Sequence, residues 1–132
     1  MSLFIDSSIW IDYFNGVETV ETDFLDSSLG KEQIVVGDLI LVKVLQGFRL
    51  DKDFDAAHHA LTRFPVLEMV NQSLAVQSAS NYRALRKKGV TIRKTVDCLI
   101  ATFCIESNLT LLHSDRDFIP FAQHLKLMVW QP

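Results

Sequence analysis

The stretch Phe4-Ile5-Asp6-Ser7-Ser8-Ile9-Trp10 decides the fold that we expect for this chain. A short apolar run ends in a carboxylate, and a helical pattern begins directly after it. This order places Asp6 at the carboxyl end of a first strand, where open parallel α/β sheets bind their ligands. Asp is also a common N-cap residue, so Asp6 alone fits either a helix cap or a site residue. Acidic residues from later strands decide between these interpretations.

The composition fits one soluble domain. The chain has 132 residues, of which 48% are hydrophobic and 22% charged, and we expect a single domain over 1–132. Its net charge of −3 argues against an entirely basic surface but leaves room for a local basic face. Cys98 and Cys104 form no metal-type cluster and suit a reducing compartment. With neither a signal-peptide pattern nor an apolar run of about 18 residues, we expect a cytoplasmic protein that does not enter membranes.

Apolar runs alternate with helical patterns along the chain. We expect strands at 2–5, 33–36, 65–67 and 109–112, and a last short strand at 127–129. Helices are expected between them, at 7–14, 17–29, 39–50, 53–64, 73–88, 95–107 and 115–122. Asp38 and Thr95 are the expected N-caps of two of these helices. The alternation predicts an α/β domain whose parallel sheet has about four or five strands joined by right-handed crossovers.

Acidic residues follow two of these strands and open one helix. Asp6 follows the first strand, Asp115 and Asp117 follow the fourth, and Asp97 enters an otherwise apolar helix. Gathered at one sheet edge, each pair of carboxylates 4 Å apart would repel by about 4 kcal/mol at an effective dielectric near 20. Mg²⁺ or Mn²⁺ would relieve that repulsion and could assist hydrolysis of a phosphodiester. The alternative is that these acids only cap helices.

A basic segment lies close to Asp97 in the sequence. It holds six of the 13 Lys and Arg residues, namely Arg83, Arg86, Lys87, Lys88, Arg93 and Lys94. Clusters of this kind bind phosphate backbones. A solvated helix end is the alternative for the charges alone, and their closeness to Asp97 favours nucleic-acid binding. We expect Arg83, Arg86, Lys87, Arg93 and Lys94 to contact the substrate.

Four motifs resemble the PIN-domain toxins of the VapC type. They run in order along nearly the whole chain, at 4–10, 44–49, 95–101 and 113–118. The resemblance implies a three-layer α/β/α fold, a small ribonuclease that uses Mg²⁺ or Mn²⁺, a homodimer, and a cognate VapB-type antitoxin that plugs the site. Asp6, Asp97 and Asp115 fall on the family's acidic positions and would bind the metal. Asp117 matches a more variable acidic position. A metal-bound water would then attack RNA, and Ser7 either binds a carboxylate or water or caps a helix.

One residue departs from the family pattern. Lys43 stands where the family carries a glutamate, directly before Val44-Leu45-Gln46-Gly47. Its ammonium would oppose a nearby metal ion, or would pair with Asp6 or Asp97 and fill the metal's place. Three explanations remain open: an inactivating change, a naturally weakened chain, or a variant in which a water or Asp117 supplies the missing ligand.

Two other classes of function are compatible with a small parallel α/β domain. A catalytically silent module would keep the fold and bind the antitoxin without cleaving RNA, and metal binding by this chain would discriminate it. A phospho-receiver domain is also a small parallel α/β protein. It needs an acceptor Asp after the third strand, where this chain offers only Glu68. The sequence therefore favours the ribonuclease.

Overall fold

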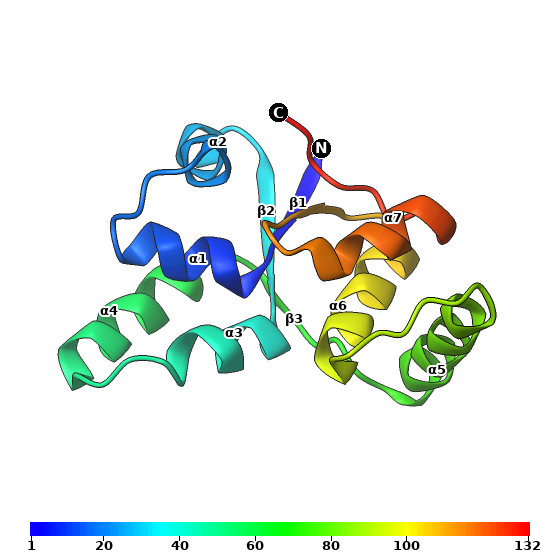
Figure 1. The fold of residues 1–132 in the computed structure, drawn as a ribbon. Coiled ribbons are helices and arrows are strands. Elements are labelled where there is room, and N and C mark those ends of the chain that lie inside the picture. The colour runs from blue at the N-terminus through cyan, green and yellow to red at the C-terminus, as the bar shows by residue number, and fades with distance from the viewer.

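A four-stranded sheet lies between two layers of helices in the computed structural model, which describes residues 1–132 (Figure 1). The strands are β1 (Ser2–Ile5), β2 (Gln33–Gly37), β3 (Val66–Leu67) and β4 (Thr110–Leu112). The helices are α1 (Ser7–Phe14), α2 (Val20–Ser28), α3 (Asp38–Leu45), α4 (Asp51–Leu61), α5 (Gln72–Lys87), α6 (Thr95–Glu106), the 3₁₀ turn η1 (Arg116–Phe118) and α7 (Ile119–His124). Helices α1 to α4 lie on one face of the sheet and α5 to α7 on the other. The predicted three-layer α/β/α architecture is confirmed.

The sheet is parallel throughout, with the strand order β3-β2-β1-β4. In the register, Leu3 of β1 lies between Ile34 and Thr110. Strand β1 is covered on both faces, and Leu3, Phe4 and Ile5 are each at most 1% exposed. Such burial explains a continuous apolar run in place of an alternating pattern.

The chain order around β1 creates the position for a site. From β1 the chain moves outward to β2 and β3, and it later returns to place β4 on the other side of β1. Ligands of open α/β sheets bind outside the carboxyl ends of strands at such a reversal. The Asp6 backbone N–H donates to the carbonyl of Leu112 at 2.9 Å, so the ends of β1 and β4 are tied together. Residues that follow these strands therefore face the same crevice.

Several predicted boundaries were wrong by a few residues. Helix α2 begins at Val20 rather than at 17, because Thr19 and Thr22 form a capping box there. Helix α3 ends at Leu45, well before the predicted 50, and the chain then turns before α4 starts at Asp51. The predicted strand at 127–129 is reduced to one bridge between Leu111 and Val129.

The two predicted N-caps were also wrong. The cap positions belong to Gly37 and Lys94, whose backbones are extended, and neither supplies a side-chain cap. Asp38 is the first residue of α3, and its carboxylate accepts the backbone N–H groups of Leu39 and Met69 at 2.8 and 3.3 Å. Asp38 thus ties the start of α3 to the segment that follows β3.

Helix α6 packs between the sheet and α5. Its residues from Ile100 to Cys104 are buried, and both cysteines of the chain, Cys98 and Cys104, are free and buried. A buried hydrogen bond of 3.0 Å from Asn81 to Thr102 joins α5 to α6. No helix combines the length and the apolar character needed to cross a bilayer. The rigid packing of α6 fixes the acidic residue in its first turn.

Candidate metal centre

Asp6 serves both as a helix cap and as a site residue. It is 3% exposed, and its Oδ2 accepts hydrogen bonds from the backbone N–H and the hydroxyl of Ser8 at 3.3 and 2.6 Å. These contacts cap α1. The other oxygen, Oδ1, is buried and has no hydrogen-bond partner. The two interpretations of Asp6 in the sequence are therefore compatible, because each uses a different carboxylate oxygen.

Asp97 lies in the first turn of α6 and is 2% exposed. Its Oδ1 accepts a hydrogen bond from the Lys43 ammonium at 3.5 Å, and its buried Oδ2 has no partner. Burial raises the pKa of the Asp97 carboxyl, and the negative charges of Asp6 and Asp115 raise it further. Lys43 and Lys94 act in the opposite direction, and the pKa remains raised. A positive charge bound at this site would favour the ionised form of Asp97.

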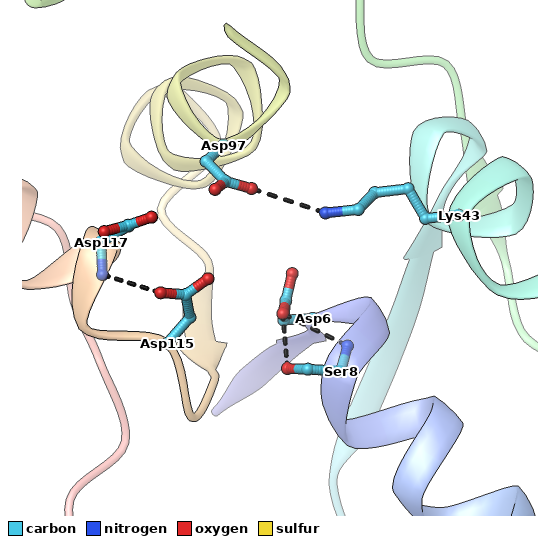
Figure 2. Close-up of polar contacts among 6 residues, drawn as sticks. All are labelled: Asp6, Ser8, Lys43, Asp97, Asp115 and Asp117. Carbon is cyan, nitrogen blue, oxygen red and sulfur yellow. Dashed lines mark hydrogen bonds and ion pairs between the residues drawn. The ribbon is translucent and has the colours of Figure 1, made fainter. Parts of the chain in front are cut away.

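Asp115 and Asp117 follow β4 and approach Asp97 from the other side of the crevice (Figure 2). Asp115 Oδ1 accepts the backbone N–H of Asp117 at 2.9 Å and so caps η1. Carboxylate oxygens of Asp97, Asp115 and Asp117 all lie within 4.8 Å of one another. Asp6 lies outside this closest group, although its negative charge acts on Asp97. The structure thus brings the four predicted acids to one crevice.

The chemistry of these donors fits a hard divalent cation. All are carboxylates, which are ligands that Mg²⁺ and Mn²⁺ prefer. Buried oxygens without partners are costly and call for an explanation. Asp6 Oδ1 and Asp97 Oδ2 are both of this kind. A divalent cation held by Asp6, Asp97 and Asp115, with Asp117 beside them, would satisfy these oxygens and offset the repulsion between the carboxylates.

Lys43 reaches into the acidic crevice from the last turn of α3. Of the two partners that the sequence left open, Asp6 and Asp97, the structure pairs it with Asp97. The Lys43 side chain is 31% exposed and that of Asp97 is 3% exposed. An ion pair this far from bulk water is screened less than a surface pair. Lys43 is therefore part of the electrostatics of the site.

The basic segment is spread over several parts of the surface. Arg93 pairs with Asp117 at 3.2 Å, and the charge of Lys94 acts on Asp97, so these two lie at the acidic crevice. Arg83 and Arg86 line a groove between α5 and α6, and Arg86 lies over the ring of Tyr82. Lys87 is exposed at the end of α5. The structure therefore gathers Arg93 and Lys94 with the acids and places Arg83 and Arg86 at the groove between α5 and α6.

Two contacts near the acids were missed in the sequence. The hydroxyl that binds Asp6 belongs to Ser8, whereas Ser7 is buried without a side-chain hydrogen bond to a carboxylate. His113 Nδ1 accepts the backbone N–H of Asp115 at 3.1 Å, and burial lowers the pKa of this histidine. The only sequence signal for His113 was its place two residues before Asp115.

Comparison with known proteins gives consistent results. The chain is 29% identical over 124 residues to the VapC ribonuclease Mb1587 of Mycobacterium bovis and to ribonuclease VapC11 of Mycobacterium tuberculosis, with 92% of each chain covered. Its fold is similar to VapBC2 from Rickettsia felis bound to a promoter DNA fragment, with a TM-score of 0.78, 18% identity and coverage of 99% and 100%. VapBC-1 from nontypeable Haemophilus influenzae matches with a TM-score of 0.75, 18% identity and coverage of 99% and 98%. The family model described as PIN domain matches residues 3–123, and the chain therefore belongs to the PIN domain family.

Proposed function

We propose that this chain is the toxin of a type II toxin–antitoxin system and acts as a Mg²⁺- or Mn²⁺-dependent endoribonuclease. The observation that carries the proposal is the meeting of Asp6, Asp97 and Asp115 at one sheet edge, where two buried carboxylate oxygens have no partner. Membership of the PIN domain family and relatives named VapC ribonuclease support the same reaction. The reaction is hydrolysis, in which water attacks phosphorus and one P–O bond of RNA breaks.

Each acid has a role in this proposal. Asp6, Asp97 and Asp115 would hold the cation, and Asp117 would complete the negative charge around it. Ser8 fixes Asp6 by binding the oxygen that faces α1, which leaves Oδ1 free to turn to the crevice. When bound, the cation supplies a more acidic water and a positive charge against the phosphodiester. The apolar core behind Asp97 keeps that carboxylate in place.

The basic residues would position the RNA. Arg93 and Lys94 lie at the crevice, where they can bind the phosphates on either side of the scissile bond. Arg83, Arg86 and Lys87 extend this positive path along α5. Contacts with phosphates provide affinity and are weakened by salt. In this arrangement the acidic residues act on the scissile phosphate, and the basic residues bind the neighbouring phosphates.

We also propose a VapB-type antitoxin as the partner, a homodimer as the assembly and the cytoplasm as the location. Solved structures of similar fold are VapBC complexes, which supports the antitoxin. Co-expression with a cognate VapB-type antitoxin should yield a complex that survives gel filtration, and light scattering of the chain alone should give the mass of a dimer. A chain that stays alone and monomeric would contradict these assignments.

RNA cleavage with and without metal tests the enzymatic part. We expect the chain to cleave RNA in Mg²⁺ or Mn²⁺ and to lose this activity in EDTA. The variant Asp97→Asn should lose both cleavage and Mn²⁺ binding by calorimetry, because a neutral amide is a poor ligand beside two acids. Asp55→Asn, an exposed position on α4, is the matched control and should behave as the parent. Unchanged Mn²⁺ affinity in Asp97→Asn would refute the metal centre.

A second candidate is a catalytically silent module that binds the antitoxin without cleaving RNA. The observation that favours it is the ion pair between Lys43 and Asp97, which places an ammonium at a proposed metal ligand. Restoring an acid with Lys43→Glu tests it. If the parent does not cleave RNA and Lys43→Glu does, Lys43 is the inactivating residue. If Lys43→Glu gains no cleavage, that explanation is wrong.

A further inference from the structure

On the α3 side of the crevice, the Lys43 ammonium donates a hydrogen bond to Asp97. It lies 3.5 Å from Asp97 Oδ1, and the side chain crosses from α3 to α6 to reach this oxygen. The contact joins residues that are 54 positions apart, so the packing of α3 against α1 and β2 decides it. Two-thirds of the lysine side chain is covered, at 31% exposed, which holds the ammonium inside the crevice.

Lys43 and the acids of β4 approach Asp97 from opposite sides. Figure 2 shows the ammonium on the side of α3, and Asp115 with Asp117 on the far side of Asp97. The ammonium uses Asp97 Oδ1 and leaves the buried Oδ2 without a partner. Asp6 also keeps a buried oxygen without a partner. Three positive charges, those of Lys43, Arg93 and Lys94, therefore act on the four carboxylates, and two buried carboxylate oxygens still have no partner.

We propose that the Lys43 ammonium is a built-in cation of the acidic crevice, which fills the cation position beside Asp97 on the α3 side. The remaining position, at Asp97 and Asp115 with Asp6 and Asp117 beside them, takes one divalent ion per chain. Lys43 acts through Asp97 and is a positioning residue. It keeps Asp97 paired before the ion arrives and weakens binding of that ion by like-charge repulsion. The inference rests on the proposed metal-dependent function.

Calorimetry with Mn²⁺ as the probe tests this assignment on the full chain. The neutral variant Lys43→Met keeps an unbranched side chain up to Cε and removes the ammonium, and Lys43→Glu reverses the charge. Lys43→Arg keeps the charge. The matched control is Lys52→Met, because Lys52 is an exposed lysine on α4. Circular dichroism checks that each variant is folded, and Lys43→Gln carries the same expectation as Lys43→Met if that variant does not fold.

The parent should bind one Mn²⁺ per chain. Removal of a positive charge near the ion should tighten binding at least about tenfold in Lys43→Met, while Lys43→Arg and Lys52→Met stay close to the parent. Lys43→Glu should bind a second Mn²⁺, because an acid then faces Asp6 and Asp97. Any of three results would overturn the assignment. These are two Mn²⁺ ions bound by the parent, Mn²⁺ affinity in Lys43→Met that equals or falls below that of the parent, and a single ion bound by Lys43→Glu.

The same titrations separate this inference from the proposed function. Mn²⁺ binding in the expected pattern without RNA cleavage by any variant would overturn the ribonuclease and leave the role of Lys43 standing. Mn²⁺ binding by the parent with no effect of Lys43→Met would overturn the role of Lys43 and leave the metal centre standing. No Mn²⁺ binding by the parent and by every Lys43 variant would overturn both.

Discussion

The Ser8 hydroxyl donates a hydrogen bond of 2.6 Å to Asp6 Oδ2, the shortest side-chain contact of any acid in the crevice. The bond links the first turn of α1 to the carboxylate at the end of β1. It fixes which oxygen of Asp6 caps the helix and which one remains without a partner. Ser8 therefore holds the Asp6 carboxylate in place through Oδ2, the oxygen that caps α1.

Replacing Ser8 tests this support. Ser8→Ala removes a hydrogen bond to a charged, buried acceptor, which should lower the free energy of unfolding by about 2 kcal/mol. Urea unfolding followed by circular dichroism measures the loss. Ser7→Ala is the control, because the neighbouring Ser7 is buried and makes no hydrogen bond to Asp6. An equal loss in both variants would show that the Ser8 hydroxyl contributes nothing specific.

The raised pKa of Asp97 predicts a pH dependence of stability in the absence of metal. Its pKa is raised above the ordinary value of 3.8, chiefly by burial, so the native state holds this proton more tightly than the unfolded state. The contribution of Asp97 to stability is then most favourable below pH 3.8 and declines as the pH rises through its native pKa.

Unfolding in EDTA over a series of pH values measures this effect. The stability of Asp97→Asn relative to the parent should rise as the pH increases from about 3.8, because only the parent loses a proton there. Asp55→Asn, at an exposed position, controls for the loss of one acid. A difference between Asp97→Asn and the parent that does not change with pH would contradict the raised pKa.

The basic path predicts a salt-dependent affinity for RNA. The double variant Lys87→Gln and Lys94→Gln should weaken binding of single-stranded RNA by an inactive Asp97→Asn chain. It should also reduce the slope of log affinity against log salt by about 1 to 2, as two phosphate contacts are lost. Fluorescence anisotropy at several salt concentrations provides the measurement. Lys31→Gln and Lys52→Gln together form the control, because both lysines are exposed, Lys31 in the turn before β2 and Lys52 on α4. If both double variants show the same slope of log affinity against log salt, Lys87 and Lys94 do not contact the RNA.

The buried thiol of Cys104 should be inert in the native protein. Burial, and to a smaller extent the charge of Asp6, raises the pKa of this thiol far above its ordinary value. Since the thiolate is the reactive form, iodoacetamide should not alkylate Cys104 at pH 8 until the chain unfolds. Mass spectrometry of native and urea-treated samples gives the result. Rapid alkylation of Cys104 in folded protein would show that α6 opens locally.

The sequence by itself determined the four strands of the parallel sheet and the acids that follow them, and the resemblance to PIN-domain toxins implied the three layers. The apolar runs at 2–5 and 33–36 predict buried parallel strands, and the structure places β1 and β2 there. Because parallel strands end at one edge, the acids after β1 and β4 had to share a crevice with each other. Asp97 could be added because a carboxylate is rare at the start of an apolar helix. These features depend on local pattern and on topology rules, which a sequence carries.

Only the tertiary structure decided which atoms meet. The phase of α1 after its cap brings Ser8, and not Ser7, to Asp6. The packing of α3 and α6 pairs Lys43 with Asp97, although residue order allowed Asp6 as well. The turn after β4 brings Asp117 into the closest group of acids and leaves Asp6 outside it. Helix phase, packing and turn geometry set distances of a few ångströms between residues far apart in the chain, and spacing along the sequence does not contain those distances.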